Sequence, residues 1–281
     1  MEKHIVKVEE ELLPFLRKEL PHKSKNNIKT LLSKGLILVD NQTITKYNYP
    51  LKKGQVITIK KTIDNHHNIS LDIIYEDNNI IVINKPTNLL TISTDKEKER
   101  TLYREVSNYL KPKKQKVFII HRLDKDTSGV IMFAKNQTIQ QKYQKDWNKT
   151  AITREYIAIV EGITKKKEHL VSYLKQNRNL EVYLSQNKEG LIAITDYEQI
   201  KHKNQYSLLK ILISTGRRNQ IRLQLKSINH PIIGDKKYQA KTNPINRLGL
   251  HAHLLKVKDP LTGKILTFEA PIPDEFTKLF K

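Results

Sequence analysis

The sequence predicts an α+β fold, in which a small α/β domain precedes a larger domain with a mixed, largely antiparallel sheet flanked by helices. After residue 71, apolar runs of strand length outnumber the helical patterns, and several follow one another without an intervening helix. A segment without periodicity separates this part from an earlier pattern of two helices and two strands. The expected domains are residues 1–61 and 71–281, joined by a linker over residues 62–70.

The first domain is expected to hold two helices followed by two short strands. Apolar residues near helical spacing, from Val8 to Leu16, predict a first helix with Pro14 in its first turn or at a kink. Ser24 is a suitable N-cap for a second helix, and Gly35 is a typical stop. The two strands are expected at residues 36–39 and 56–59.

The second domain is expected to begin with two short strands around a turn at residues 77–79. Helical patterns follow at residues 102–110 and 138–147. Further strands are expected at residues 117–120, 130–134, 156–160, 193–199 and 206–213.

The 281-residue chain is strongly basic, with 51 Lys and Arg against 29 Asp and Glu and a net charge of +22. Part of the lysine is solvated surface, but such a charge favours a polyanionic partner, with nucleic acid ahead of a membrane surface. No apolar run approaches the roughly 20 residues of a spanning helix, and the acidic N-terminus does not resemble a signal peptide. The absence of Cys excludes disulfides and thiolate metal sites. We therefore expect a soluble, cytoplasmic protein.

The first domain carries 13 Lys and Arg against 6 Asp and Glu. Lys25 and Lys29 lie one helical turn apart and are expected to share an exposed face. The two helices and the segment GLILVDNQTITKYNYPLKKGQVITI resemble the small RNA-binding domain shared by a ribosomal small-subunit protein and tyrosyl-tRNA synthetases. This resemblance implies that Lys25 and Lys29 bind RNA. The alternative is an αβ fragment whose lysines are merely solvated.

The polar segment 121–129 lies between two apolar strands, which places its carboxylates at the edge of a core. Catalytic groups are often held in such loops by a rigid scaffold. From the spacing alone, either Asp124 or Asp126 could carry the chemistry. The alternative is a turn closed by an ion pair between Arg122 and one of these carboxylates.

The segment HRLDKDTSGV resembles the signature of the RluA-type pseudouridine synthases, in which the Asp after His-Arg-Leu is the nucleophile. That position is Asp124. The segments TREYIAIVEG and STGRRNQIRLQLKSINHPIIGDKKY resemble two further motifs, and they place Tyr156 and Arg222 at the active-site tyrosine and the basic position of the family. The resemblance spans about residues 71–270. It implies an isomerase that converts uridine to pseudouridine in RNA.

The chemistry fits these residue types. The glycosidic bond of uridine must break, and the base must rotate and rejoin the ribose through carbon 5. One carboxylate can attack or deprotonate the ribose, with no metal, redox centre or other cofactor. In a closed pocket that carboxylate needs a cation to stay ionised, and Arg222 is the candidate. Tyr156 offers a ring to stack on the extruded uracil.

Each assignment has an alternative. In a helix over residues 218–228, Arg218, Arg222 and Lys226 could form a solvated or phosphate-binding face. Tyr156 could be a core residue of its strand. Arg122 could fill the place of the extruded base, as this family position is thought to do, or could contact a phosphate. We assign Arg122 and Arg218 to RNA binding.

Some positions depart from the family pattern. Arg218-Asn219 replaces the usual Thr-His, which bears on substrate choice. Asn88 and Asn229 stand where Gly is usual, and Asn tolerates the left-handed conformation next best.

Four histidines could suggest a metal site. His251 and His253 alternate on one strand face and could coordinate zinc as a pair, but without Cys or a clear third ligand we expect structural roles. His66 and His67 are interpreted as polar linker residues.

The expected protein is a monomeric isomerase acting on structured RNA, either large-subunit ribosomal RNA or tRNA. A non-enzymatic RNA-binding or ribosome assembly factor would fit the basic composition equally well, but it would not need Asp124, Tyr156 and Arg222 together. A metal-dependent nuclease ranks last, because only Asp124 and Asp126 lie close together.

Overall fold

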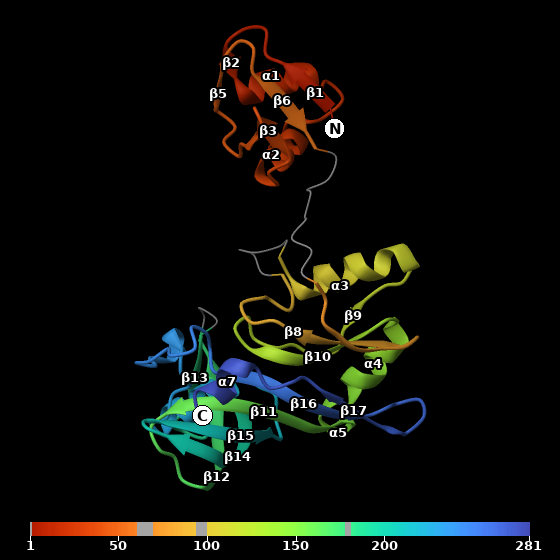
Figure 1. Ribbon diagram of the computed structural model, residues 1–281. Helices are drawn as coiled ribbons and strands as arrows, with labels where there is room; N and C mark the ends of the chain where they lie inside the picture. Colours follow the sequence, from red (N-terminus) through yellow and green to blue (C-terminus); the bar gives the residue numbers. More distant parts are fainter. Residues whose placement is uncertain (1, 61–69, 94–99, 178–180) are drawn as a thin grey trace. The chain divides into compact units, whose positions relative to one another are not determined.

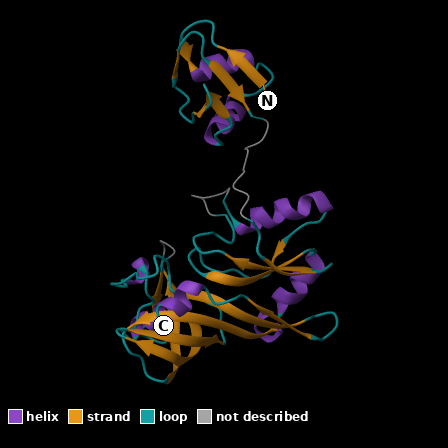
Figure 2. Ribbon diagram, in the orientation of Figure 1, coloured by secondary structure: helices purple, strands orange, loops and turns teal. Residues whose placement is uncertain are grey.

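The computed structural model describes residues 2–60, 70–93, 100–177 and 181–281 (Figure 1). The chain folds as two compact units, residues 1–68 and 69–281. Each unit has its own hydrophobic core, and Figure 2 shows that each contains both helices and strands. Most of the expected linker over residues 62–70, with His66 and His67, lies outside the described residues.

The first unit packs two helices against a four-stranded sheet with the strand order β1-β6-β3-β4. Helix α2 (Lys25–Ser33) begins at Ser24 as predicted, because the Ser24 hydroxyl accepts a hydrogen bond from the Asn27 N–H at 3.2 Å. The strands are β1 (Glu2–Ile5), β2 (Glu10–Glu11), β3 (Ile37–Val39), β4 (Gln42–Thr43), β5 (Pro50–Leu51) and β6 (Val56–Ile59), with β2 paired to β5.

The first helix is shorter than the apolar pattern predicts. Helix α1 (Leu12–Glu19) leaves Val8 outside, where its side chain is 69% exposed. Pro14 accounts for this limit, since a residue without an N–H fits only in the first turn of a helix. The buried side of α1 is formed by Leu12, Leu13, Phe15 and Leu16.

The second unit is built on an 11-stranded sheet with the order β13-β12-β14-β15-β11-β16-β10-β8-β7, with β17 beside β16 and β9 beside β10. In the part of the chain that the structure describes, β10 and β16 pair in parallel and the other strand pairs are antiparallel. This confirms the predicted α+β fold with a mixed, largely antiparallel sheet.

The strands of this sheet are β7 (Ile73–Glu76), β8 (Ile80–Lys85), β9 (Phe118–Ile119), β10 (Ser128–Ala134), β11 (Ala151–Glu161), β12 (Lys167–Gln176), β13 (Val182–Leu184), β14 (Leu191–Lys203), β15 (Tyr206–Ile213), β16 (Leu250–Lys258) and β17 (Ile265–Glu269). The helices are α3 (Leu102–Leu110), α4 (Gln137–Lys145), α5 (Trp147–Thr150), α6 (Gln220–Ser227) and α7 (Asp274–Lys278), with 3₁₀ turns at Lys111–Lys113 and Lys236–Tyr238.

Strands β8 and β10 are buried on both faces, because helices α3 and α4 cover opposite sides of them. In β8, Ile81 and Ile83 share a cluster with α3, whereas Ile80 and Val82 share one with α4. Continuous apolar runs such as that of β8 are typical of strands covered on both faces.

The helix predicted at residues 102–110 coincides with α3. The pattern at residues 138–147 instead forms α4 and α5, which are separated at Asp146, where the backbone leaves the helical region. Helix α6 begins later than predicted, because Asn219 has a left-handed φ of 54°. Strands β12, β13 and β17 were not among the expected elements, and β13 and β17 are only three and five residues long.

Gly129 allows β10 to approach β16 closely. A Cβ atom at this residue would lie 2.0 Å from the Ala252 carbonyl oxygen, and Gly129 has a φ of +110°. Only glycine meets both conditions without strain. The close pairing brings the segment that precedes β10 beside β16, and β11 is the next strand in the sheet.

Candidate active site

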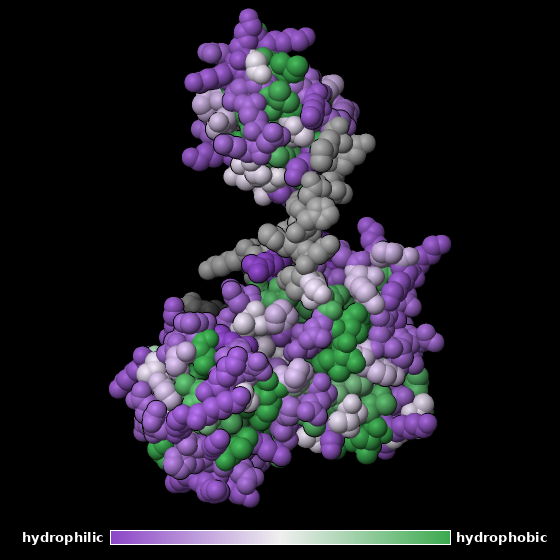
Figure 3. All heavy atoms as spheres, viewed as in Figure 1, coloured by the Kyte–Doolittle hydropathy of each residue, from purple (hydrophilic) through white to green (hydrophobic). Residues whose placement is uncertain are grey.

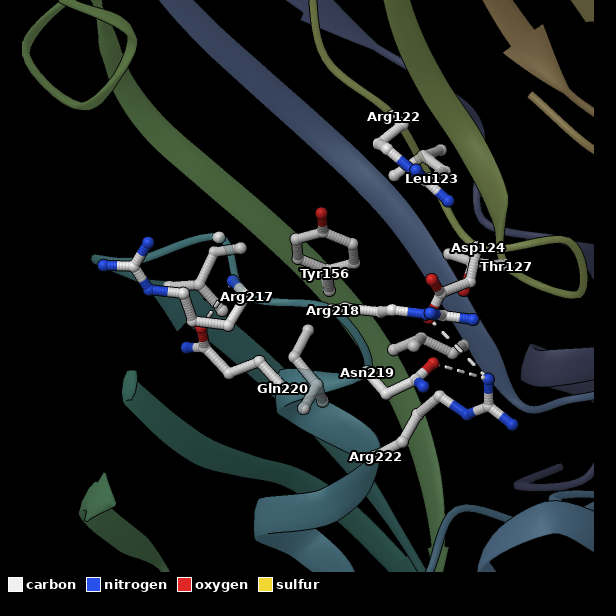
Figure 4. Close-up of a pocket in the computed structure, with 14 residues that line it drawn as sticks. Arg122, Leu123, Asp124, Thr127, Tyr156, Arg217, Arg218, Asn219, Gln220 and Arg222 are labelled. Carbon is white, nitrogen blue, oxygen red and sulfur yellow. Dashed lines mark hydrogen bonds and ion pairs between the residues drawn. The ribbon is translucent and has the colours of Figure 1, made fainter. Parts of the chain in front are cut away.

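A cavity of about 190 Å³ lies in the second unit, where segments far apart in the sequence meet (Figure 4). The segment before β10 contributes one wall, β11 and β15 contribute the floor, and the start of α6 closes the other side. The lining residues are Arg122, Leu123, Asp124, Thr127, Tyr156, Ile213, Gly216, Arg217, Arg218, Asn219, Gln220, Ile221, Arg222 and Leu250.

Of the two candidate carboxylates, Asp124 lines this cavity and Asp126 does not. The loop that carries them is anchored by Leu123, whose side chain is buried. The Leu123 carbonyl oxygen accepts a hydrogen bond from the Thr91 hydroxyl, and the Leu123 N–H donates one to the same hydroxyl. At Asp126 the backbone carbonyl accepts a hydrogen bond from the Thr87 hydroxyl at 2.7 Å. The loop therefore presents Asp124 to the cavity and is held to the segment after β8.

Lys85 fastens the same two segments together. The side chain is completely buried, and its Nζ donates hydrogen bonds to the carbonyl oxygens of Pro86, Leu89 and Lys125 at 3.0, 2.8 and 3.0 Å. Burial lowers the pKa of Lys85 to about 7. Lys125 directly follows Asp124, so this buried amino group fixes the backbone beside the candidate nucleophile. Sequence reasoning did not identify Lys85, because a lysine at the end of a strand ordinarily faces water.

Arg222 faces Asp124, but the carboxylate nearest to its guanidinium group is that of Asp235. The Arg222 Nη1 lies 3.7 Å from the Asp124 Oδ2, whereas its Nε and Nη2 donate hydrogen bonds to Asp235, both at 2.7 Å. Burial lowers the pKa of Arg222, but Asp235 and then Asp124 outweigh it and raise that pKa overall. The guanidinium group is therefore a permanent cation in the cavity wall.

The alternative that Arg222 belongs to a solvated helix face is wrong, since Arg222 is only 7% exposed. Helix α6 is short and is buried on most of its sides, including the polar residues Gln220 and Gln224. Arg218 remains exposed and precedes the helix; in Figure 4 its side chain extends toward Asp124.

Tyr156 also lines the cavity, and in Figure 4 its hydroxyl points away from Arg218 and α6. The ring is partly buried and packs against the clusters on both of its sides. Burial raises the pKa of Tyr156 to about 12, so the phenol is protonated at neutral pH. The side chain thus contributes to the core and also exposes an aromatic face to the cavity.

Arg122 is exposed at the rim of the cavity. The alternative of a turn closed by an ion pair between Arg122 and Asp124 is not what the structure shows, because Asp124 faces Arg222 instead. Arg217 and Arg218 lie in the segment before α6 and also line the cavity. Three arginines around one opening favour an anionic ligand.

The two Asn residues at usual glycine positions keep a glycine-like backbone. Asn88 has a φ of 59° and Asn229 a φ of 62°, both left-handed. These departures from the family pattern therefore leave the local backbone conformation intact.

His251 and His253 have protein partners. The Nδ1 atom of His251 bonds the Ser128 hydroxyl at 2.8 Å, and that of His253 bonds the Ala270 carbonyl at 2.8 Å. Among the described residues, no group of three or more His, Cys, Asp or Glu side chains could hold a metal ion. Nor does any helix of the described ranges have the length and apolar character needed to cross a membrane.

In the first unit, Lys25 and Lys29 are exposed on α2, as predicted. The Nζ of Lys29 lies 5.6 Å from the centroid of the Tyr47 ring, and Tyr47 is 55% exposed. Hydrophilic residues cover most of the face of this unit that is visible in Figure 3.

Comparisons with known proteins agree with this geometry. The RNA pseudouridylate synthase model matches residues 79–227, and the S4 domain model matches residues 12–57. A ribosomal large subunit pseudouridine synthase D from Haemophilus influenzae is 31% identical over 283 residues, which cover 92% of this chain and 86% of that protein. The protein of the same name from Vibrio cholerae is 29% identical over 277 residues, covering 91% and 86%.

The solved structure of human RNA pseudouridylate synthase domain containing 4 shares the fold, with a TM-score of 0.60 and 20% identity over 73% of this chain and 90% of that chain. The chain therefore belongs to the RNA pseudouridylate synthase family. It is of the RluA type and is an isomerase with an S4 domain in its first unit, so the resemblance drawn from the sequence motifs is confirmed.

Proposed function

We propose that this protein isomerises one or more uridines of large-subunit ribosomal RNA, with Asp124 as the nucleophile. The observation that carries the proposal is the cavity in which Asp124, the buried cation Arg222 and the Tyr156 ring meet. The names of its relatives, ribosomal large subunit pseudouridine synthases, support this choice of RNA, and tRNA is the other substrate that the sequence leaves open.

The proposed reaction assigns one task to each group. The Asp124 carboxylate attacks the ribose as the bond between carbon 1′ and N1 of uracil breaks. Arg222, whose Nη1 lies 3.7 Å from the Asp124 Oδ2, places a positive charge beside that carboxylate, and the Tyr156 ring supports the base as it turns. Carbon 5 then bonds to carbon 1′ as the bond between carbon 1′ and Asp124 breaks, which releases the carboxylate. The proton leaves carbon 5 and N1 takes up a proton, so the atoms balance as an isomerisation.

The arginines at the opening are assigned to the RNA. We propose that Arg218 contacts a phosphate beside the target uridine, and that Arg122 either fills the place of the extruded base or contacts a phosphate. We also propose that the protein acts as a monomer. A ribosomal RNA substrate also fits a cytoplasmic location.

The direct test is to map pseudouridine in total RNA from cells with and without this gene. We expect one or more large-subunit ribosomal RNA sites to be lost and then restored by the wild-type gene, but not by an Asp124→Asn gene. Loss confined to tRNA would reassign the substrate. An unchanged map would support the non-enzymatic RNA-binding alternative.

Tyr156 provides a test of stacking. Tyr156→Leu removes the ring, whereas Tyr156→Phe keeps it. Base stacking on an aromatic ring contributes roughly 1–3 kcal/mol, so we expect the Leu variant to convert RNA about 5- to 150-fold more slowly than the Phe variant. Single-turnover release of tritium from RNA carrying 5-tritiated uridine measures this step. Equal rates for the two variants would exclude a stacking role.

The S4 unit is expected to bind RNA through lysine–phosphate contacts. Lys25→Gln/Lys29→Gln should lower RNA affinity and reduce the dependence of log K on log salt by up to about 2, because each lost phosphate contact removes roughly one released counterion. A matched control is Lys3→Gln/Lys7→Gln, which removes the same charge from another part of the unit. Binding across a salt series distinguishes them, and equal slopes for both double variants would contradict the assignment.

A further inference from the structure

One buried carboxylate beside the cavity has no part in the proposed reaction. The Asp235 side chain is completely buried, and it begins the 3₁₀ turn Lys236–Tyr238 by accepting the Tyr238 N–H at 3.2 Å. An ionised group with no access to water is costly unless it is fully paired. The pairing partner of Asp235 is Arg222.

Asp235 occupies one complete edge of the guanidinium group. Its two oxygens accept from Nε and Nη2 of Arg222, both at 2.7 Å, in a bidentate arrangement. The remaining nitrogen, Nη1, donates to the Asn219 side-chain oxygen at 3.1 Å and lies 3.7 Å from Asp124 (Figure 4). The Tyr238 ring lies 5.1 Å from the guanidinium carbon and restricts its movement.

This arrangement keeps Arg222 close to Asp124 without a direct hydrogen bond. Asp235 accepts hydrogen bonds from two of the three guanidinium nitrogens, and Asn219 accepts one from the third. A carboxylate bound by two hydrogen bonds from an unshared guanidinium would be more stable as an anion and therefore a poorer nucleophile. The separation of 3.7 Å leaves the Asp124 oxygens available to the ribose.

We propose that Asp235 is a positioning residue for the isomerisation, acting through Arg222, and that Asn219 assists it. The inference rests on the proposed role of Asp124. Asp235 sets the orientation of the guanidinium group and limits the charge that Asp124 experiences. Its removal should let Arg222 turn toward Asp124 and pair with it directly.

The test is Asp235→Asn, assayed by single-turnover conversion at saturating RNA across a pH series. We expect the plateau rate to fall about 10- to 100-fold, as a misplacement near 1 Å can cause, with RNA affinity within about twofold of wild type. The acid limb of the rate profile should move to lower pH, because Asp124 becomes the only carboxylate paired with Arg222. A rate and an acid limb equal to those of wild type would overturn the proposal.

Other titratable groups near Asp124 are Lys85, Tyr156 and Tyr238, and Asp235→Asn leaves all three in place. A displaced acid limb of the rate profile would therefore report a change in how Arg222 pairs with Asp124. A variant that merely weakened the fold would lower the rate without moving the limb, and that outcome would also overturn the proposal.

Two further variants sharpen the result. Asn219→Ala keeps the pair of Asp235 and Arg222, so we expect a slower plateau rate with an unmoved acid limb. Asp196→Asn is the matched control, since Asp196 is half-exposed, pairs with His169 at 2.6 Å and lies outside the cavity. It should behave as wild type. If wild type and Asp124→Asn convert RNA equally, the proposed function itself fails, which is distinguishable from the failure of this inference.

Discussion

Asp124→Asn is expected to abolish the conversion of uridine, lowering the single-turnover rate by roughly 10⁴-fold or more, as the loss of a nucleophile generally does. The amide has the shape of the carboxylate but cannot attack the ribose. Asp124 contacts Arg222 only at 3.7 Å, and Arg222 keeps its bidentate bonds to Asp235. The fold and the RNA affinity should therefore change little.

Asp126→Asn is the matched control, since it changes the same side chain two residues away and outside the cavity. It should retain substantial activity. Tritium release at saturating RNA, together with thermal unfolding of each variant, separates lost chemistry from lost structure. If Asp126→Asn were inactive and Asp124→Asn active, the assignment of the nucleophile would be wrong.

Lys85→Met should lower the free energy of unfolding by about 2–4 kcal/mol, more than any other substitution proposed for this protein. Methionine fills a similar volume but leaves three carbonyl oxygens, of Pro86, Leu89 and Lys125, without their donor in a buried site. Because Lys125 follows Asp124, we also expect the rate at saturating RNA to fall. Denaturant unfolding measures the first effect, and tritium release measures the second.

The control for this substitution is Lys165→Met, at an exposed lysine whose ion pair with Glu168 lies on the surface. Surface pairs of this kind contribute little, so its unfolding free energy should change by less than about 0.5 kcal/mol. A similarly small change for Lys85→Met would contradict the view that this lysine fastens the loop.

The structural features that could be predicted from the sequence are those determined by interactions between residues close together in the chain. Ser24 caps its helix through Asn27, three residues away, and α3 follows from its own amphipathic spacing. The loop around Asp124 was recognisable because it is polar and lies between two apolar strands. Its motif then distinguished Asp124 from Asp126, which spacing alone could not do.

The environment of Arg222 was not predictable in the same way. Helical spacing left a solvated face open for this residue, yet it is buried because Asp235, thirteen residues later, pairs with it. Lys85 is likewise buried, and its Nζ donates a hydrogen bond to the carbonyl oxygen of Lys125, forty residues later. Sequence periodicity does not predict such contacts, because they form between segments that meet only in the folded chain.

The place of β16 in the sheet has a consequence for synthesis of the protein. This strand lies between β10 and β11, although it is made long after both. A nascent chain that ends before β16 lacks the strand that joins the Asp124 loop to Tyr156, and it exposes two apolar strand edges meanwhile. Such high contact order slows folding. The cavity can therefore form only after β16 has left the ribosome.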